Sequence, residues 1–546
     1  MPELIKKILW KHPYLTVFMA ALISWLPVVF IPFINDDYQI LGYHAGKGWI
    51  SLIRPFYTPD VSNFYWRPLG NVLHPLILLL TGFHPLGFRI VSLMLYGLCC
   101  VLIAKTGEKI GLSRSVSALG AVLFAVLPSH EYQVAWIADE GESLVTIMLL
   151  GAFYFYINSF SILRNAGKNL LAYFLLLFAA ALVKESAFAG VLIPFSALLA
   201  YGDFSRKRIP SVIRDVFVSF ALIVLILLYR WYFIGGTPFS SNHFAHSGLL
   251  RWLLNFFIYI PLGFFSPESL EIAAKGTPLM LLSAAALAAA LALYFLFIHR
   301  RPVKLEKPEK YKLAAAFSWF VIFIIPGLPT LMRWYVFTAS VGLIWSLSVI
   351  GENIRSIFTR KASFSILAVL ILVSAVYDIS LMTRWGSVGR DLNEALLSLN
   401  AEGRELKADS VYVWATPDKS RRIPMMKLGT QESVQRGLRN NKVTVISPLR
   451  SEMAGSDSRI DLVEKTDTSF VFHISDGRFL PYGGESRAVV KNESIETEAE
   501  GIKIRIKTFL DESLKPQSIA GVYFKKPSAV PQLYFDGREF KKARSK

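Results

Sequence analysis

The sequence predicts a polytopic α-helical membrane protein that ends in a smaller soluble domain. Of its 546 residues 53% are hydrophobic, and the mean hydropathy is +0.44. Soluble domains of this size are less apolar. The apolar residues form long runs between residues 14 and 382, with short charged loops between them, whereas residues 385–546 have an ordinary soluble composition. We therefore expect a membrane domain over residues 1–384 and a second domain over residues 385–546.

The apolar runs predict about eleven membrane-spanning helices. They cover residues 14–34, 86–104, 115–128, 141–160, 169–183, 187–201, 212–234, 278–298, 313–330, 334–350 and 364–382. Two amphipathic stretches, 68–82 and 251–265, are shorter: a helix of this length rises about 22 Å, and the hydrocarbon core is about 30 Å thick. We expect both to lie as helices on the outer interface, and the orientation of everything downstream depends on this.

The basic residues predict the orientation in the membrane. Lys and Arg gather in loops such as 105–114, 206–214 and 300–312, which the positive-inside rule assigns to the cytoplasm. The basic segment 6–11 precedes the first span without a small-residue cleavage site, so we expect a retained signal anchor with a cytoplasmic N-terminus. An odd number of spans then places the C-terminal domain outside the cytoplasm. The expected location is a bacterial inner membrane.

The net charge of +18 does not indicate a nucleic-acid partner, because much of the excess lies in these short loops. The only two cysteines, Cys99 and Cys100, are adjacent, which excludes a disulfide framework and a C-x-x-C metal site. Residues 385–546 alternate strand-like runs with turn residues, which predicts a small α/β or mostly β domain. The runs are Val411–Trp414, Val443–Ile446, Phe470–Ile474, Ile502–Ile506 and Val522–Phe524.

Polar motifs gather at the ends of spans that face the outer side. Charge beside hydrocarbon is costly and usually serves a function, so these motifs define the candidate site. They are Asn35-Asp36-Asp37-Tyr38, Tyr65-Trp66-Arg67-Pro68-Leu69, the stretch 128–142 with His130, Glu131 and Asp139, Lys184-Glu185-Ser186, and Arg333-Trp334-Tyr335. Simpler interpretations stay open: His130-Glu131 as a helix cap, Lys184-Glu185 as an internal ion pair, and Arg333 as a snorkelling side chain.

Taken in order, these motifs resemble the GT-C superfamily of polytopic glycosyltransferases. The resemblance rests on Asp-Asp after the first span, "YWRPL", "LPSHEYQVAWIADEGE", "VKES" and "RWYVFTASVG", and it covers roughly residues 14–385. The nearest groups are bacterial protein-O-mannosyltransferase-like proteins and the membrane part of the transmembrane O-mannosyltransferases that carry tetratricopeptide repeats. This chain lacks the repeats and has "DEGE" where that group often has a basic residue, so the resemblance does not identify the acceptor.

The resemblance implies transfer of a sugar, of the hexosyl type, from a polyprenyl-phosphate-linked donor to an acceptor at the outer face, with inversion. The acceptor is a protein, a glycan or a lipid. Asp36 is the expected general base, and Asp37 is expected to orient the acceptor or to help bind a divalent cation, Mg²⁺ or Mn²⁺. Lys184 and Arg333, with Arg67 behind them, are the expected partners of the donor phosphate. His130, Glu131 and Asp139 are expected to bind sugar hydroxyls or a metal.

Two other functions remain open. A polymerase or ligase of lipid-linked glycans also uses outer loops, but Asp-Asp after the first span argues against it. A transporter or flippase of envelope glycans is expected to carry broken, polar segments near the bilayer midplane in two matching halves. The sequence has no such pairing, and its ionisable residues lie at one edge.

Overall fold

The computed structural model divides the chain into two compact units, and each has its own buried apolar core. The first contains residues 1–29 and 46–383, and the second contains residues 30–45 and 384–546. The structure describes residues 11–58, 66–161, 165–206, 208–233, 248–265, 305–329, 331, 333–353, 357–403, 409–420, 423–426, 430–439, 442–454, 458–481, 489–491, 494–499, 502–510, 516–525 and 531–543.

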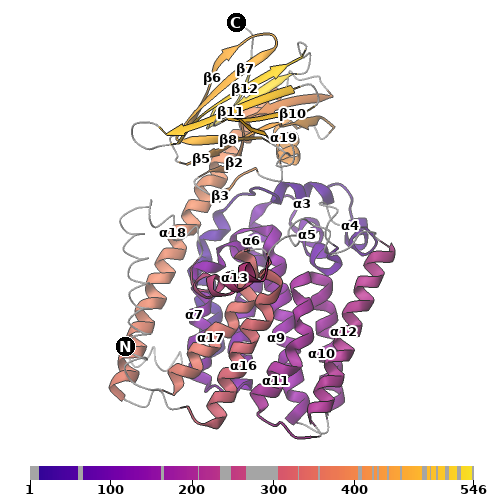
Figure 1. The fold of residues 1–546 in the computed structure, drawn as a ribbon, viewed down its shortest axis with the longest axis vertical. Helices are drawn as coiled ribbons and strands as arrows, with labels where there is room; N and C mark the ends of the chain where they lie inside the picture. Colours follow the sequence, from indigo (N-terminus) through magenta and orange to yellow (C-terminus); the bar gives the residue numbers. More distant parts are fainter. Residues whose placement is uncertain are drawn as a thin grey trace. The chain divides into compact units, whose positions relative to one another are not determined.

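The first unit is a bundle of apolar helices. Neighbouring helices pack along their lengths, as α9 (Glu140–Ser161) does with α10 (Ala166–Val183) and α16 (Lys307–Ile324) with α17 (Val336–Glu352) (Figure 1). The chain is an integral membrane protein. In the described ranges, seven helical segments are long and apolar enough to cross a membrane: Pro13–Phe30, Pro85–Lys109, Ile137–Phe160, Ala166–Val183, Arg208–Tyr232, Lys307–Gly327 and Ala368–Leu399.

These seven segments confirm helices at the corresponding predicted spans. The predicted spans 115–128, 187–201 and 334–350 correspond to shorter apolar helices, Arg114–Ala125, Glu185–Tyr201 and Val336–Glu352. The predicted span 278–298 lies outside the described residues. The two amphipathic stretches form α5 (Pro68–Thr81) and α13 (Leu249–Leu262), each of 14 residues. The helices are therefore confirmed where they are described, and the total number of spans stays a prediction.

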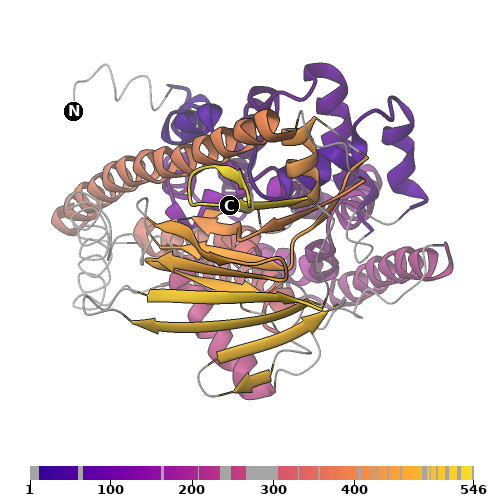
Figure 2. The same ribbon diagram turned by 90° about the horizontal axis from the view of Figure 1, so that it is seen from above.

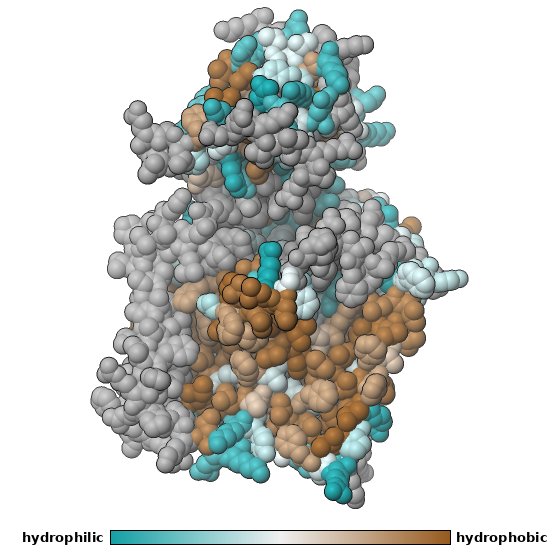
Figure 3. All heavy atoms as spheres, viewed as in Figure 1, coloured by the Kyte–Doolittle hydropathy of each residue, from teal (hydrophilic) through white to brown (hydrophobic). Residues whose placement is uncertain are grey.

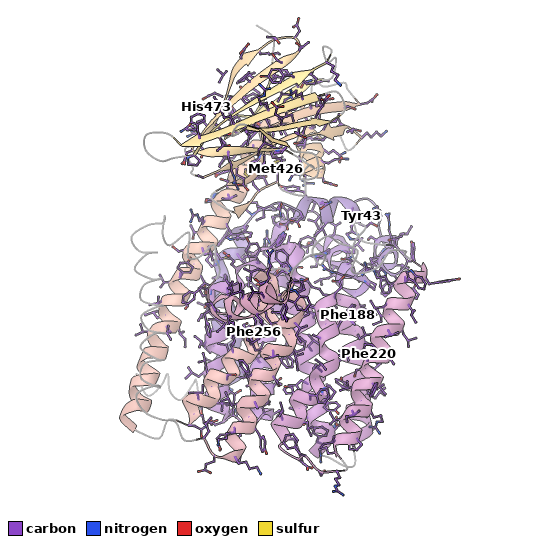
Figure 4. The ribbon with its side chains drawn as sticks, in the orientation of Figure 1. Tyr43, Phe188, Phe220, Phe256, Met426 and His473 are labelled. Carbon is purple, nitrogen blue, oxygen red and sulfur yellow. The ribbon has the colours of Figure 1, made fainter. Side chains whose placement is uncertain are left out.

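The outward faces of the bundle carry large apolar side chains. On α12 (Arg208–Phe233), for example, Phe217 is 69% exposed and Phe220, labelled in Figure 4, is 57% exposed. Figure 3 shows apolar residues over much of the visible face of the helical unit and hydrophilic residues at one end of the helices. So extended an apolar surface is unfavourable in water and suits contact with lipid. Inside the bundle, the rings of Trp319, Trp345 and Phe153 pack on one another.

A single long helix, α18 (Ile357–Gly403), runs from the first unit into the second. In the part of the second unit that the structure describes, the strands form three sheets, with the orders β14-β13-β1-β4, β6-β7-β12-β11-β10-β9 and β3-β2-β5-β8. The strands are β1 (Ser410–Trp414), β2 (Thr416–Ser420), β3 (Ile423–Pro424), β4 (Thr444–Ile446), β5 (Leu449–Met453), β6 (Arg459–Lys465), β7 (Ser469–Ser475), β8 (Gly477–Pro481), β9 (Val489–Lys491), β10 (Ser494–Ala499), β11 (Ile502–Leu510), β12 (Pro516–Phe524), β13 (Gln532–Phe535) and β14 (Phe540–Lys542).

The six-stranded sheet is antiparallel, and its strands lie side by side in Figure 2. In β11 the side chains of Ile502, Ile504 and Ile506 are buried, whereas Lys503 and Arg505 point to the exposed face. This alternation is what a sheet with one covered face requires. All five predicted strand runs overlap observed strands, and the prediction of a small α/β or mostly β domain for this region is confirmed.

The second unit also contains a segment from the beginning of the chain. Residues 30–45, including α3 (Asp37–His44), group with residues 384–546, and α3 packs against α19 (Thr430–Leu438). The sequence had assigned this segment to the membrane domain with the rest of residues 1–384. Hydropathy is averaged over residues that are neighbours in sequence, so it cannot reveal a contact between segments almost 400 residues apart.

Candidate active site

The loop before α3 carries Asp36 and Asp37, and the fold buries both. Asp36 is 8% exposed and Asp37 is fully buried. The backbone N–H of Ile34 donates to Asp37 Oδ2 at 3.1 Å, and the side-chain amide of Asn35 donates to Asp36 Oδ1. Of the two carboxylates, Asp36 is therefore the one with some access to an incoming group. Hydrogen bonds from the loop itself hold both in place.

A second set of charges lies in the first unit, around the end of α10. Lys184 follows the last residue of α10, and its Nζ lies 2.9 Å from Asp139 Oδ1 and 2.6 Å from Glu142 Oε1. The amide of Gln133 donates to Asp139 Oδ2 at 2.9 Å. The side chain of Lys184 is only 6% exposed, so this is a buried ion pair with two carboxylates on one ammonium group.

Arg67 and Glu185 form an adjacent ion pair. The Nε and one terminal nitrogen of Arg67 each lie 2.8 Å from Glu185 Oε2. The close packing of α5 on the end of α10 brings them together: a Cβ on Gly70 would lie 2.7 Å from the carbonyl oxygen of Val183. Both side chains keep some solvent contact, at 22% and 24% exposure.

The two pairs form one electrostatic network. Burial by itself lowers the pKa of Lys184, but Asp139 and Glu142 outweigh it and raise the pKa above its ordinary value. Burial raises the pKa of Glu185, but Arg67 outweighs it, so this pKa lies below its ordinary value. Tyr335 interacts electrostatically with both cations. With all five charged groups ionised, the network carries one net negative charge.

His130 lies elsewhere, in the aromatic core of the helical unit. Its Nδ1 is 2.9 Å from Tyr96 Oη and its Nε2 is 3.2 Å from Ser340 Oγ, and the rings of Phe124 and Phe337 flank it. Burial lowers the pKa of His130 to about 3, so its imidazole is neutral at physiological pH. Both ring nitrogens have protein partners, which favours a structural role over contact with a sugar or a metal.

The neighbouring Glu131 is also buried, and it interacts electrostatically with Asp378 of α18. Asp378 is fully buried, and neither of its carboxylate oxygens has a hydrogen-bond partner among the described residues. The sequence had not singled out Asp378. An aspartate inside a long apolar run is itself a signal, because such residues in spans are usually functional.

The structure does not test the predicted roles of Arg333 and of a divalent cation. The backbone of Arg333 lies in a short helix, Arg333–Tyr335, but its side chain is outside what the structure describes. Within the described ranges, no three His, Cys, Asp or Glu side chains lie close enough together to hold a metal ion. The described residues therefore do not form a complete set of metal ligands, and the divalent cation stays a prediction.

The sequence placed Asp139, Lys184 and Arg67 in one site, and the structure brings these three together. From the sequence, Glu142 had no assigned role and Glu185 was considered only as an ion-pair partner of Lys184. The structure pairs Glu142 with Lys184 and Glu185 with Arg67. One signal was available: Asp139 and Glu142 are three residues apart, so in a helical segment they lie on one face. Glu185 gave no such signal, because its partner lies 118 residues away.

Comparison with known proteins gives partial matches. No protein-family model matches the chain. Human protein O-mannosyl-transferase TMTC1 is 30% identical over 158 residues, 27% of this chain and 18% of that protein. Mouse TMTC4 is 27% identical over 117 residues, 19% of this chain and 16% of that protein. The matches thus span less than a fifth of these relatives, and they confirm the resemblance to transmembrane O-mannosyltransferases that the motifs predict.

Solved structures show similarity over more of the chain. The crystal structure of ArnT from Cupriavidus metallidurans in the apo state has a TM-score of 0.49 at 11% identity, covering 81% of this chain and 93% of that chain. The Saccharomyces cerevisiae Pmt1–Pmt2 complex bound to the sugar donor has a TM-score of 0.31 at 21% identity, covering 40% of this chain and 33% of that chain.

Proposed function

We propose that this protein is a membrane glycosyltransferase that moves a sugar from a polyprenyl-phosphate-linked donor to an acceptor hydroxyl on the extracytoplasmic side, with inversion. The observation that carries the proposal is the buried Asp36-Asp37 loop, in which the amide of Asn35 donates to Asp36. A carboxylate fixed at the start of a short helix, with slight access, suits a general base. The order of the motifs and the partial matches to TMTC1 and TMTC4 support the same class.

The reaction is a single displacement at C1 of the sugar. The acceptor oxygen forms a bond to C1, the bond from C1 to the phosphate oxygen breaks, and the bonding electron pair leaves with the polyprenyl phosphate. The proton of the acceptor hydroxyl passes to Asp36. Asp37 is fully buried, so in place of the expected contact with the acceptor it holds the loop through the hydrogen bond from the Ile34 N–H. A divalent cation, if the enzyme uses one, supplies positive charge to the leaving phosphate.

The leaving phosphate needs a positively charged partner, and Arg67 is the better of the described candidates. Its side chain is 22% exposed, against 6% for Lys184. Lys184 is also held by two buried carboxylates, whereas the ion pair of Arg67 with Glu185 keeps solvent contact on both side chains. We place the donor phosphate on Arg67, where it takes over from Glu185. Lys184 then keeps the end of α10 in position.

The test is transfer by the purified full-length protein. It is given labelled polyprenyl-phosphate monosaccharides and an envelope extract as acceptor, together with Asp36→Asn and the control Asp203→Asn, which changes an exposed aspartate paired with Arg208. We expect transfer by the wild type and the control, and a loss of about 10²-fold or more in Asp36→Asn. Unchanged transfer by Asp36→Asn would refute its role as base. If only preassembled oligosaccharides, and no monosaccharides, are transferred, the protein is a polymerase or ligase. Uptake into vesicles without transfer indicates a transporter.

A further inference from the structure

The loop with the candidate base is attached to the C-terminal unit. The backbone N–H of Asn35 donates to the carbonyl of Met425 at 2.8 Å. The next residue, Met426, is hydrogen-bonded through both of its backbone groups. Its N–H donates to Pro417 O in β2 at 2.9 Å, and its carbonyl accepts from the Thr430 hydroxyl at the start of α19 at 2.6 Å. Met426 is labelled in Figure 4. The position of Asn35 is thus set by the core of the second unit.

Asn35 also contacts the carboxylate. Its side-chain amide donates to Asp36 Oδ1, while its backbone N–H is engaged with Met425. The backbone of Asn35 has φ of 52°, in the left-handed region that Asn tolerates better than most residues. One residue therefore joins the C-terminal unit to the side chain that is proposed to take the proton.

The helix that follows the loop is docked just as closely. A Cβ on Gly42 of α3 would lie 2.9 Å from Glu432 Cγ and 3.3 Å from Glu432 Cβ of α19. Tyr38 is buried and interacts electrostatically with Arg436, one turn further along α19. These contacts hold α3 against α19 along its length, so the loop is fixed at both ends.

We infer that the C-terminal unit positions the Asp36-Asp37 loop for catalysis, with Asn35 as the positioning residue that acts through Asp36. The inference rests on the proposed function. It gives the C-terminal region a role in the transfer step itself, since misplacing a reacting group by about 1 Å can cost about 10²-fold in rate. A region that only tethered the acceptor would need no hydrogen bond to the base-bearing loop.

The role of Asn35 is tested with Asn35→Gly. Glycine keeps the left-handed backbone and the N–H that donates to Met425, and it removes the side-chain amide that donates to Asp36. We expect kcat to fall by about tenfold or more while KM for the lipid-linked donor stays within about twofold, as for a group that acts in the transition state. The thermal unfolding temperature is measured alongside. An unchanged kcat, or a loss that appears only as a higher KM, contradicts the positioning role.

The docked arrangement is tested with the double variant Gly42→Cys/Glu432→Cys. The two Cβ positions, 3.3 Å apart, lie close to the distance of a disulfide, about 3.5–4.5 Å. We expect the pair to crosslink under mild oxidation, and the oxidised protein to transfer sugar at no less than about half the rate of the same protein after reduction. The single variants, Gly42→Cys and Glu432→Cys, control for oxidation of the native cysteines, which are buried.

The outcomes separate the two claims. Failure to crosslink, or a crosslinked protein that is inactive until it is reduced, overturns the inference because the docked loop is then absent or is not the active state. If the wild type transfers sugar from no donor and only the crosslink forms, the proposed function fails and the docking contact alone survives. If the wild type is active and Asp36→Asn is not, an inactive crosslinked protein refutes the positioning role alone.

Discussion

The ammonium group of Lys184 lies 2.9 Å from Asp139 Oδ1, inside a bundle where the lysine side chain is 6% exposed. Glu142 Oε1 lies 2.6 Å from the same ammonium. This cation stabilises the end of α10, because removing the ammonium leaves two buried carboxylates without their counter-charge in a region of low dielectric.

Lys184→Met is therefore expected to destabilise the protein by about 3–5 kcal/mol, the cost of breaking a buried ion pair from one side. The measurement is thermal unfolding in detergent, with Lys168→Met as the control, because Lys168 is exposed on the first turn of the same helix. The triple variant that adds Asp139→Asn and Glu142→Gln is expected to regain most of the loss. Equal stability of the Lys184 and Lys168 variants would show that the buried pair is not holding this part of the bundle.

Arg67→Ala is expected to raise KM for the lipid-linked donor by about tenfold or more, because a phosphate loses a charged partner. Glu185→Gln is expected not to raise it, because Glu185 competes with the phosphate for Arg67. The matched control is Arg208→Ala, which breaks a pair of similar length and exposure, 2.9 Å from Asp203. A KM for Arg67→Ala no different from the control would remove Arg67 from the donor site.

Acidification is expected to destabilise the protein through His130. Burial lowers the pKa of His130 to about 3, whereas the unfolded chain has the ordinary value of 6.5. The stabilising contribution is fully present above pH 6.5 and is lost as the pH falls from 6.5 towards 3, by about 1.4 kcal/mol per pH unit. The measurement compares the slopes of stability against pH for the wild type and His130→Asn between pH 6.5 and 5. The variant should show the shallower slope, and parallel curves would contradict the assignment.

The membrane topology can be tested with reporter fusions. We expect a reporter fused after Lys546 to lie outside the cytoplasm and a reporter inserted in the loop at residues 202–205 to lie inside it. The reason is the odd span number together with the basic loops, whose charge keeps them on the cytoplasmic side. The loop insertion controls for expression and orientation of the first six spans. A cytoplasmic signal from the C-terminal fusion, with the loop insertion still inside, would mean that α13 or the stretch 278–298 departs from its predicted role. Reversal of both reporters would instead mean that α5 spans the membrane.

The spanning helices and the strands could be predicted from the sequence because each is encoded by a pattern of neighbouring residues. An apolar run of sufficient length predicts a spanning helix wherever it occurs, as at Pro85–Lys109. The alternation of Ile502, Lys503, Ile504, Arg505 and Ile506 likewise predicts a strand with one covered face. The same reasoning singled out Asp36, Asp139 and Lys184, because charged residues next to apolar runs stand out without knowledge of the fold.

Which charges meet was decided only by the tertiary structure. Neighbours in sequence suggested that Lys184 pairs with Glu185, yet Lys184 binds Asp139 and Glu142, and Glu185 binds Arg67 from 118 residues earlier in the chain. The backbone of Lys184 is extended after α10, so consecutive side chains point in opposite directions there. Partners then depend on how α5, α9 and α10 pack, which no local pattern records.

The sequence by itself determined that this is a membrane protein with a mostly β C-terminal region and polar motifs at the ends of its spans, since each of these follows from short-range pattern. Only the tertiary structure showed that the loop of Asp36 belongs with that C-terminal region. The hydrogen bond from Asn35 to Met425 joins residues 390 positions apart. Such a contact depends on how distant segments of the chain pack together, and local composition and periodicity do not reveal it.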